Sequence, residues 1–182
     1  NSPHKVIAND YNSFKLSIDK IKNFSLKNFY LKKKQIISNY IFDKKITTIN
    51  LSIKQKNLME LEQLKKNALN RGIITKNDKK WFPAQLHSDF NNIKKVNIRL
   101  KGDNVDHVSN KLKTSFRVKL KSNDNVLGMR KFSLQAPQTR GYWGEIFFLE
   151  MMRQVGVLAP RSYFVKVNQN GHDIGIMNIE EA

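Results

Sequence analysis

The sequence of 182 residues contains no cysteine. This absence excludes disulfides and thiolate metal ligands, but it leaves the redox compartment open because a chain without cysteine tolerates either. No run of about twenty apolar residues occurs, so we expect no membrane-spanning helix within these residues. The four histidines, His4, His87, His107 and His172, are scattered, and none forms the short-range pair that a zinc site normally uses.

Acidic residues are also scarce. Only 15 Asp and Glu accompany 33 Lys and Arg, which gives a formal net charge of +18 at pH 7. This charge attracts the phosphates of nucleotides, nucleic acids or anionic lipid surfaces, and it does not choose among them. The abundance of Lys, Asn and Ile is equally typical of A/T-rich coding sequence, in which case most of the charge is a solvated face without a particular partner.

The pattern of apolar residues predicts strands and helices over most of the chain after residue 45. Alternation of apolar and polar residues predicts strands at 46–53, 81–87, 95–101, 114–121, 131–135, 162–168 and 174–179. Apolar residues at a spacing of three to four predict helices at 57–71 and at about 141–154, the first ending at Gly72. Polar residues at 89–92 predict a hairpin turn, and the Asn170-Gly171 pair suits the positive backbone angles of another.

These elements predict an α+β fold: a mostly antiparallel sheet with one long inserted helix, preceded by an amino-terminal extension. The boundary is expected near residue 54. Residues 1–54 would form a basic extension with short strands, and residues 55–182 the main domain. Because the chain starts at Asn1 and stops at Ala182 directly after an expected strand, we expect it to be a piece of a longer protein.

Several short motifs occur in a specific order. They begin with Arg99-Leu100-Lys101-Gly102-Asp103, Asp106-His107 and Ser115-Phe116-Arg117-Val118-Lys119, and continue with Gly128-Met129, Phe132-Ser133-Leu134-Gln135, Pro137, Thr139-Arg140, Glu145, Gly156, Asn170-Gly171, Gly175 and Glu180. Together they resemble the CotH-type (spore-coat protein H) kinases, particularly their membrane-anchored bacterial relatives. The resemblance covers residues 57–182 and is strongest after residue 96.

The resemblance implies an atypical protein kinase that binds ATP with Mg²⁺ and transfers the γ-phosphate to hydroxyls of a protein substrate. It implies that residues 55–182 resemble a protein-kinase small lobe, the nucleotide-facing amino-terminal lobe. The large lobe, with the catalytic aspartates and the metal ligands, is expected beyond Ala182, so this piece alone is expected to turn over no ATP. The relatives further imply an extracytoplasmic or membrane-anchored location in a bacterium.

Phosphoryl transfer needs fixed positive charge beside the triphosphate. Lys119 is the favoured phosphate contact, with Arg117 next, because both project from the polar face of the strand at 114–121. Lys101 and Arg99 are expected to do the same from the neighbouring strand. The alternative is that these four residues are ordinary charges on the solvent-exposed face of a sheet.

The remaining candidate residues flank this face. Glu145, early in the second helix, resembles the family's helical glutamate and is expected to hold Lys119 or Arg117, whereas its alternative role is a favourable acid near a helix amino terminus. Arg140 binds phosphate or braces its loop. Gly102 is the only glycine of the loop at 102–110, which therefore departs from the glycine-rich cradle of ordinary kinases. The backbone of Glu180 and Glu181 is expected to meet adenine, or else is an exposed strand end.

Two other classes of function remain open. A nucleic-acid-binding module would use the charge together with Phe24, Phe29, Tyr30 and Tyr40, but no nucleic-acid motif is present and such a partner is not expected. A noncatalytic interaction domain, resembling a pseudokinase, would keep the architecture without the chemistry. An anionic membrane surface is a further candidate partner for the basic residues 1–44.

Overall fold

The computed structural model describes residues 46–88, 93–121 and 123–182. Residues 46–146 and 160–182 belong to one compact unit, and residues 147–159 belong to another. Within the described residues, no helix combines the length and the apolar character that crossing a membrane requires. The expected turn at 89–92 and the basic segment 1–44 lie outside the described residues.

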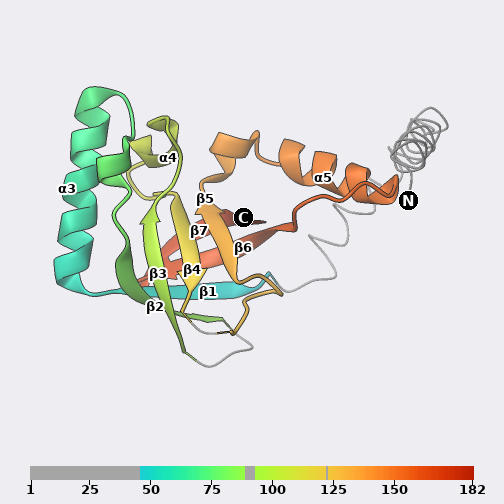
Figure 1. The fold of residues 1–182 in the computed structure, drawn as a ribbon, viewed down its shortest axis with the longest axis horizontal. Coiled ribbons are helices and arrows are strands. Elements are labelled where there is room, and N and C mark those ends of the chain that lie inside the picture. The colour runs from blue at the N-terminus through green and yellow to red at the C-terminus, as the bar shows by residue number, and fades with distance from the viewer. Residues whose placement is uncertain (1–45, 89–92, 122) are drawn as a thin grey trace, which may run out of the picture. The chain divides into compact units, whose positions relative to one another are not determined.

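A closed barrel is the centre of the larger unit (Figure 1). Its strands are β1 Thr48–Ile53, β2 Phe82–Ser88, β3 Lys94–Leu100, β4 Phe116–Leu120, β5 Lys131–Gln135, β6 Ser162–Gln169 and β7 His172–Glu181. They are hydrogen-bonded in the order β1-β2-β3-β4-β5-β7-β6. The barrel closes where β1 pairs with β6 in parallel, with Thr48 opposite Lys166, while the other neighbours pair antiparallel.

The barrel interior follows from the alternation of apolar residues. Along β2 every second residue is buried, and β4 buries Phe116, Val118 and Leu120 while Arg117 and Lys119 point outward. Because neighbouring side chains on a strand point to opposite faces, the apolar set fills the interior and the polar set covers the outside. Val96, Ile98, Phe132, Leu134 and Ile179 are among the fully buried residues of this core.

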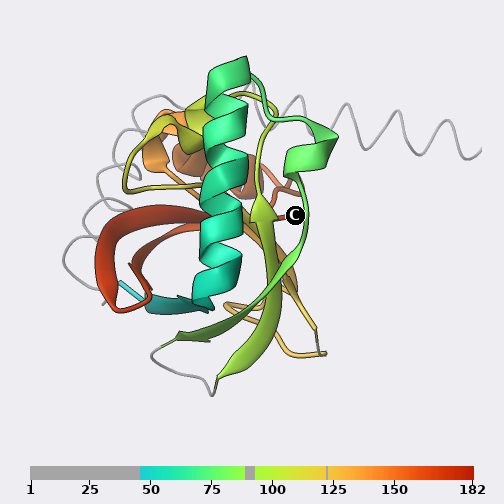
Figure 2. The same ribbon diagram turned by 90° about the vertical axis from the view of Figure 1, so that its left-hand side faces the viewer.

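The helices lie between the strands in sequence. They are α3 Gln55–Arg71, α4 Asp106–Ser109 and α5 Gly144–Gln154, with short 3₁₀ turns at Lys76–Asp78 and Pro137–Arg140. Leu61 and Ala68 of α3 are buried in the barrel core, and Figure 2 shows this helix standing in front of the strands. As expected, α3 is followed by Gly72 in the left-handed conformation that favours glycine (φ 75°).

The α+β fold class predicted from the sequence is wrong. The seven strands close into a mixed barrel, whereas the sequence predicted a mostly antiparallel sheet resembling a kinase small lobe. The inserted helix is also not long, since α5 has 11 residues and the longer helix, α3, precedes β2. The physical reason is the β1 to β6 pairing, which joins the two edges that the sequence pattern leaves open.

The hairpin turn predicted at Asn170-Gly171 is confirmed, since both residues have positive φ angles, 50° and 85°. The turn also helps to close the barrel. Asn170 accepts a hydrogen bond from the Ile53 backbone N–H at 2.7 Å and donates one to the Ile53 carbonyl at 3.0 Å. These contacts fasten the end of β1 to the β6–β7 turn.

Candidate functional site

A pocket of about 380 Å³ opens beside the ends of β3 and β4. We call it the cationic pocket. Lys79, Arg99, Lys101, Gly102, Asp103, Asn104, His107, Arg117 and Arg140 line it. Five of these side chains are cationic and one is a carboxylate, so the pocket has a strong excess of positive charge.

Lys101 lies immediately after β3 and is only 7% exposed. Its Nζ donates a hydrogen bond to Gln135 Oε1 at 2.5 Å. Burial, and next the nearby charge of Arg140, lower the pKa of Lys101 to about 8, although Glu180 acts in the opposite direction. The ammonium group is therefore short of compensating negative charge near neutral pH.

Gln135 is a junction between the cations and the acids of this region. Its buried Oε1 accepts from Lys101 and from Arg140 Nε at 2.9 Å, while its Nε2 donates to Glu180 Oε2 at 2.5 Å. Arg140 is also in ion-pair range of Glu145 at 3.2 Å and of Glu180 at 3.4 Å. The Gln135 amide thus holds the side chains of Lys101 and Arg140 at the same oxygen atom and connects both, through its nitrogen, to Glu180.

The carboxyl group of Glu145 is also affected by its surroundings. Burial, followed by the charge of Glu180, raises the pKa of Glu145, and Arg140 partly offsets this. Both acids lie near Arg140, and neither lines the pocket. They partly neutralise Arg140 without filling the space in front of it.

Arg117 and Arg99 stand opposite each other across the β3–β4 pair. Burial, and next the charge of Arg99, lower the pKa of Arg117. Among the described residues, the buried Nε of Arg117 has no hydrogen-bond partner. Arg99 packs over the Trp81 ring at 5.2 Å and donates to the Leu100 carbonyl at 3.1 Å. Two facing guanidinium groups repel each other, so an anion between them would be stabilised.

Gly102 and His107 shape the loop that borders the pocket. Gly102 has a φ of 91°, and a Cβ there would lie 1.9 Å from His107 Cδ2. Only glycine lets the imidazole lie against the backbone. Burial is the main reason that the pKa of His107 is lowered, and its Nδ1 has no hydrogen-bond partner among the described residues.

The segment between β1 and β2 holds the same loop from outside. The Ile74 N–H donates to the Asp103 carbonyl at 2.8 Å, and Lys79 forms an ion pair with the Asp103 carboxylate. Buried Lys65 of α3 donates to Thr114 Oγ1 at 3.0 Å, at the other end of the loop. The loop is therefore anchored at both ends to residues that precede β2.

The structure brings together five of the residues singled out from the sequence, Arg99, Lys101, Gly102, Arg117 and Arg140. Lys119, the favoured phosphate contact, does not line the pocket. It is exposed on β4, opposite Asn97 on one neighbouring strand and Lys131 on the other. Glu145, expected to hold Lys119 or Arg117, pairs with Arg140 instead.

Glu180 reaches the site through Gln135 and Arg140, whereas Glu181 pairs with Arg161 at 2.5 Å. The backbone N–H of Glu181 donates to the Arg161 carbonyl, and that of Ala182 donates to the Lys131 carbonyl. These two donors therefore take part in backbone pairing of the barrel, and the expected contact of adenine with the backbone of Glu180 and Glu181 stays a prediction.

Sequence reasoning missed Lys79, His107 and Gln135 as parts of the site. His107 and Gln135 lie within the motifs that resemble CotH kinases, but no role in the site was assigned to them from the sequence. No sequence motif contains Lys79, which follows a short polar turn. Only the fold places it beside Asp103, with which it forms an ion pair.

The sequence comparison covers most of this pocket. Residues 98–182 match the CotH kinase protein family. No curated protein matches the chain. The matched segment contains every residue lining the cationic pocket except Lys79, so the pocket lies where this chain is similar to CotH kinases. The first two strands and α3 precede the match.

Proposed function

We propose that this chain is the nucleotide-facing part of an atypical protein kinase, and that the cationic pocket binds the phosphate groups of ATP. The observation that carries the proposal is the convergence of five cationic side chains on one pocket, four of them within the segment that resembles CotH kinases. Transfer of the γ-phosphate to protein hydroxyls is part of the proposal.

The donor set fits phosphate. Arg99, Arg117 and Arg140 offer planar guanidinium groups that can bind two phosphate oxygens at once. Lys101 supplies a compact charge whose direction is set by Gln135. The unpartnered Nε of Arg117 and Nδ1 of His107 are buried polar atoms at the same place, and such atoms normally have a partner.

ATP would supply the phosphoryl group and would normally arrive with Mg²⁺. In the part of the chain that the structure describes, no group of three His, Asp or Glu side chains could hold a metal ion. The proposal therefore assigns no residue here to the metal. Asp103, Glu145 and Glu180 are each paired with a cation. We therefore expect this chain by itself to bind ATP without turning it over.

A titration of ATP into the protein by calorimetry tests the proposal, with adenosine as the control for phosphate dependence. Arg117→Gln should weaken ATP binding by about tenfold, the loss expected for one charge-assisted contact. Lys119→Gln is the matched control, because it removes a charge from the same face of β4 but outside the pocket. An equal loss in both variants, or equal affinity for adenosine and ATP, would contradict the proposal.

The protein substrate and the location are inferred from the resemblance alone. We extend the proposal to a protein substrate with hydroxyl acceptors and to an extracytoplasmic or membrane-anchored location in a bacterium.

A further inference from the structure

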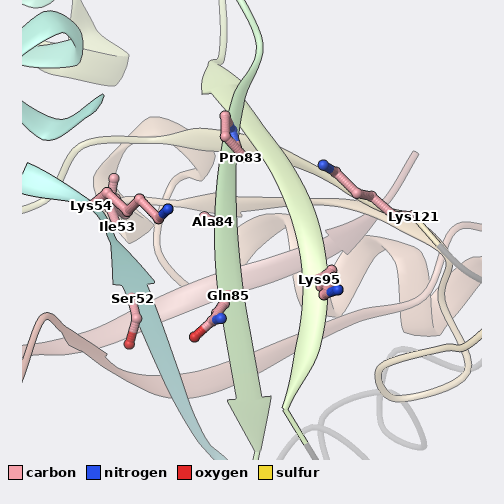
Figure 3. Close-up of a pocket in the computed structure, with 8 residues that line it drawn as sticks. All are labelled: Ser52, Ile53, Lys54, Pro83, Ala84, Gln85, Lys95 and Lys121. Atoms are coloured by element: carbon pink, nitrogen blue, oxygen red, sulfur yellow. The ribbon is translucent and has the colours of Figure 1, made fainter. Parts of the chain in front are cut away.

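A second pocket, of about 350 Å³, lies on the outer side of β1, β2 and β3 (Figure 3). It shares no residue with the cationic pocket. Its lining residues are Ser52, Ile53, Lys54, Pro83, Ala84, Gln85, Lys95 and Lys121. We call it the lysine-rimmed pocket.

The outer wall of this pocket has a single apolar side chain that points outward, that of Pro83, which is exposed. Ile53 and Ala84 are opposite each other in the β1–β2 pair and are only 4% and 9% exposed, because their side chains belong to the core. Proline has no backbone N–H, and the Pro83 carbonyl already accepts a hydrogen bond from Asn57 Nδ2 at 3.0 Å. The wall around Pro83 therefore offers little to a polar ligand, but it can accept an apolar side chain.

The rim is positively charged. Figure 3 shows Lys54 and Lys121 extending toward β2 from opposite sides, with Lys95 on β3 between Gln85 and Lys121. The lining contains no acidic residue, and among the described residues none of these three lysines is in an ion pair. Lys54 also precedes α3, whose first turn contains no acidic residue.

The position of this pocket separates it from the proposed phosphate site. Every lining residue except Lys121 precedes residue 98, where the match to the CotH kinase protein family begins. The pocket is therefore a feature of the segment that this chain adds to the matched region.

We propose that the lysine-rimmed pocket binds an acidic segment of a partner protein, in which carboxylates flank a single apolar side chain. The apolar side chain packs against Pro83, and the carboxylates pair with Lys54, Lys95 and Lys121. The volume of about 350 Å³ is at the lower end of the range of small-ligand pockets. This inference does not depend on ATP binding at the cationic pocket.

Fluorescence anisotropy with a labelled nine-residue peptide tests it, the peptide having a central leucine with four glutamates on each side. The triple variant Lys54→Gln, Lys95→Gln and Lys121→Gln should lose about tenfold in affinity, which corresponds to modest contributions from three exposed pairs. The matched control is Lys66→Gln, Lys111→Gln and Lys131→Gln, which removes the same charge at exposed positions outside both pockets. The control should bind like the original protein.

A second peptide, with serine in place of leucine, tests the apolar part and should bind several times more weakly. Equal losses in the two triple variants would overturn the proposal in favour of unspecific attraction to a basic protein. So would equal affinity for the leucine and serine peptides. Vesicles of phosphatidylcholine and phosphatidylserine distinguish a membrane surface: binding that the first triple variant alone abolishes would assign the pocket to lipid and overturn the peptide proposal. ATP affinity of the first variant should be unchanged, which separates this test from that of the proposed function.

Discussion

Burial of the charged Lys101 side chain lowers the stability of the fold but places a cation in the cationic pocket. Its folded-state pKa of about 8 lies below the ordinary value of 10.5, chiefly because of burial. Between these two pH values the unfolded chain holds a proton that the folded chain has released, so the stability of the fold rises with pH in this window. Below about pH 8 the full cost of burying the charge is present. A phosphate bound in the pocket would compensate the buried charge of Lys101 and so stabilise the folded protein at neutral pH.

The charge of Lys101 should make ATP binding sensitive to pH. We expect affinity to fall between pH 7 and pH 9 as the ammonium group loses its proton, and Lys101→Arg to remove most of this decline because arginine stays charged. Calorimetric titrations at several pH values measure the effect. ATP itself gains negative charge as pH rises, so the comparison of the two proteins is decisive. Parallel declines in both would show that Lys101 is not the titrating group.

Gly102 gives a second prediction at the residue scale. Gly102→Ala places a Cβ against the His107 ring at a backbone φ of 91°. The substitution should cost about 1–3 kcal/mol of unfolding free energy, the range for a strained backbone position. Denaturant unfolding measures it. Gly171→Ala is the control, because its φ is also positive but no atom lies within 4 Å of the new Cβ. A smaller loss for Gly102→Ala than for Gly171→Ala would contradict the contact with His107.

At the scale of elements, the segment from α3 to the start of β2 holds the pocket loop in place. Its own geometry depends on Asp78, whose buried carboxylate accepts from Arg71 Nη2 at 2.6 Å and from the Thr75 N–H at 2.7 Å. Although burial alone would raise the pKa of Asp78, these hydrogen bonds lower it below its ordinary value. The stability that this lowered pKa provides is therefore present above the unfolded pKa and is lost as pH falls through the folded pKa.

Asp78→Ala should reduce the unfolding free energy by about 2 kcal/mol, because it leaves the Thr75 N–H and Arg71 without their acceptor. Chemical unfolding at neutral pH measures the loss. Asp124→Ala, which removes a mostly exposed partner of Lys94, should cost less than about 1 kcal/mol. Similar values for the two variants would show that Asp78 does not anchor this segment.

The sequence predicted elements better than it predicted their assembly. Lys131–Gln135 was found with the observed bounds, and Gly72 and Asn170-Gly171 marked real boundaries, because these signals are local. Alternation also put Arg117 and Lys119 on the outer face of β4, but it does not say which end of the strand faces the pocket. For that reason the preference for Lys119, with Arg117 next, did not distinguish the residue that lines the pocket from the one that does not.

For the whole molecule, the decisive contact is the β1 to β6 pair, whose partners stand more than a hundred positions apart in the sequence. No local pattern predicts such a pairing, so the sequence predicted a mostly antiparallel sheet without predicting its closure. Closure makes the first three strands part of the same core as the segment that matches CotH kinases.

We therefore expect a chain of residues 98–182 alone to lack a cooperative unfolding transition. It lacks β1, β2 and most of β3, and its apolar interior would be exposed to water. Thermal unfolding followed by circular dichroism measures this, with residues 46–182 as the comparison. A sharp transition in the shorter chain would show that the barrel is not one cooperative unit.

The central claim is that the cationic pocket binds the phosphates of a nucleotide. Nuclear magnetic resonance of the ¹⁵N-labelled protein during an ATP titration tests it most directly. We predict that the largest shifts occur at the backbone amides of Gly102, Asn104 and His107 and at the side chains of Arg117 and Arg140, and that Lys119 changes little. Shifts centred on Lys119, or spread evenly over the exposed lysines, would contradict the account.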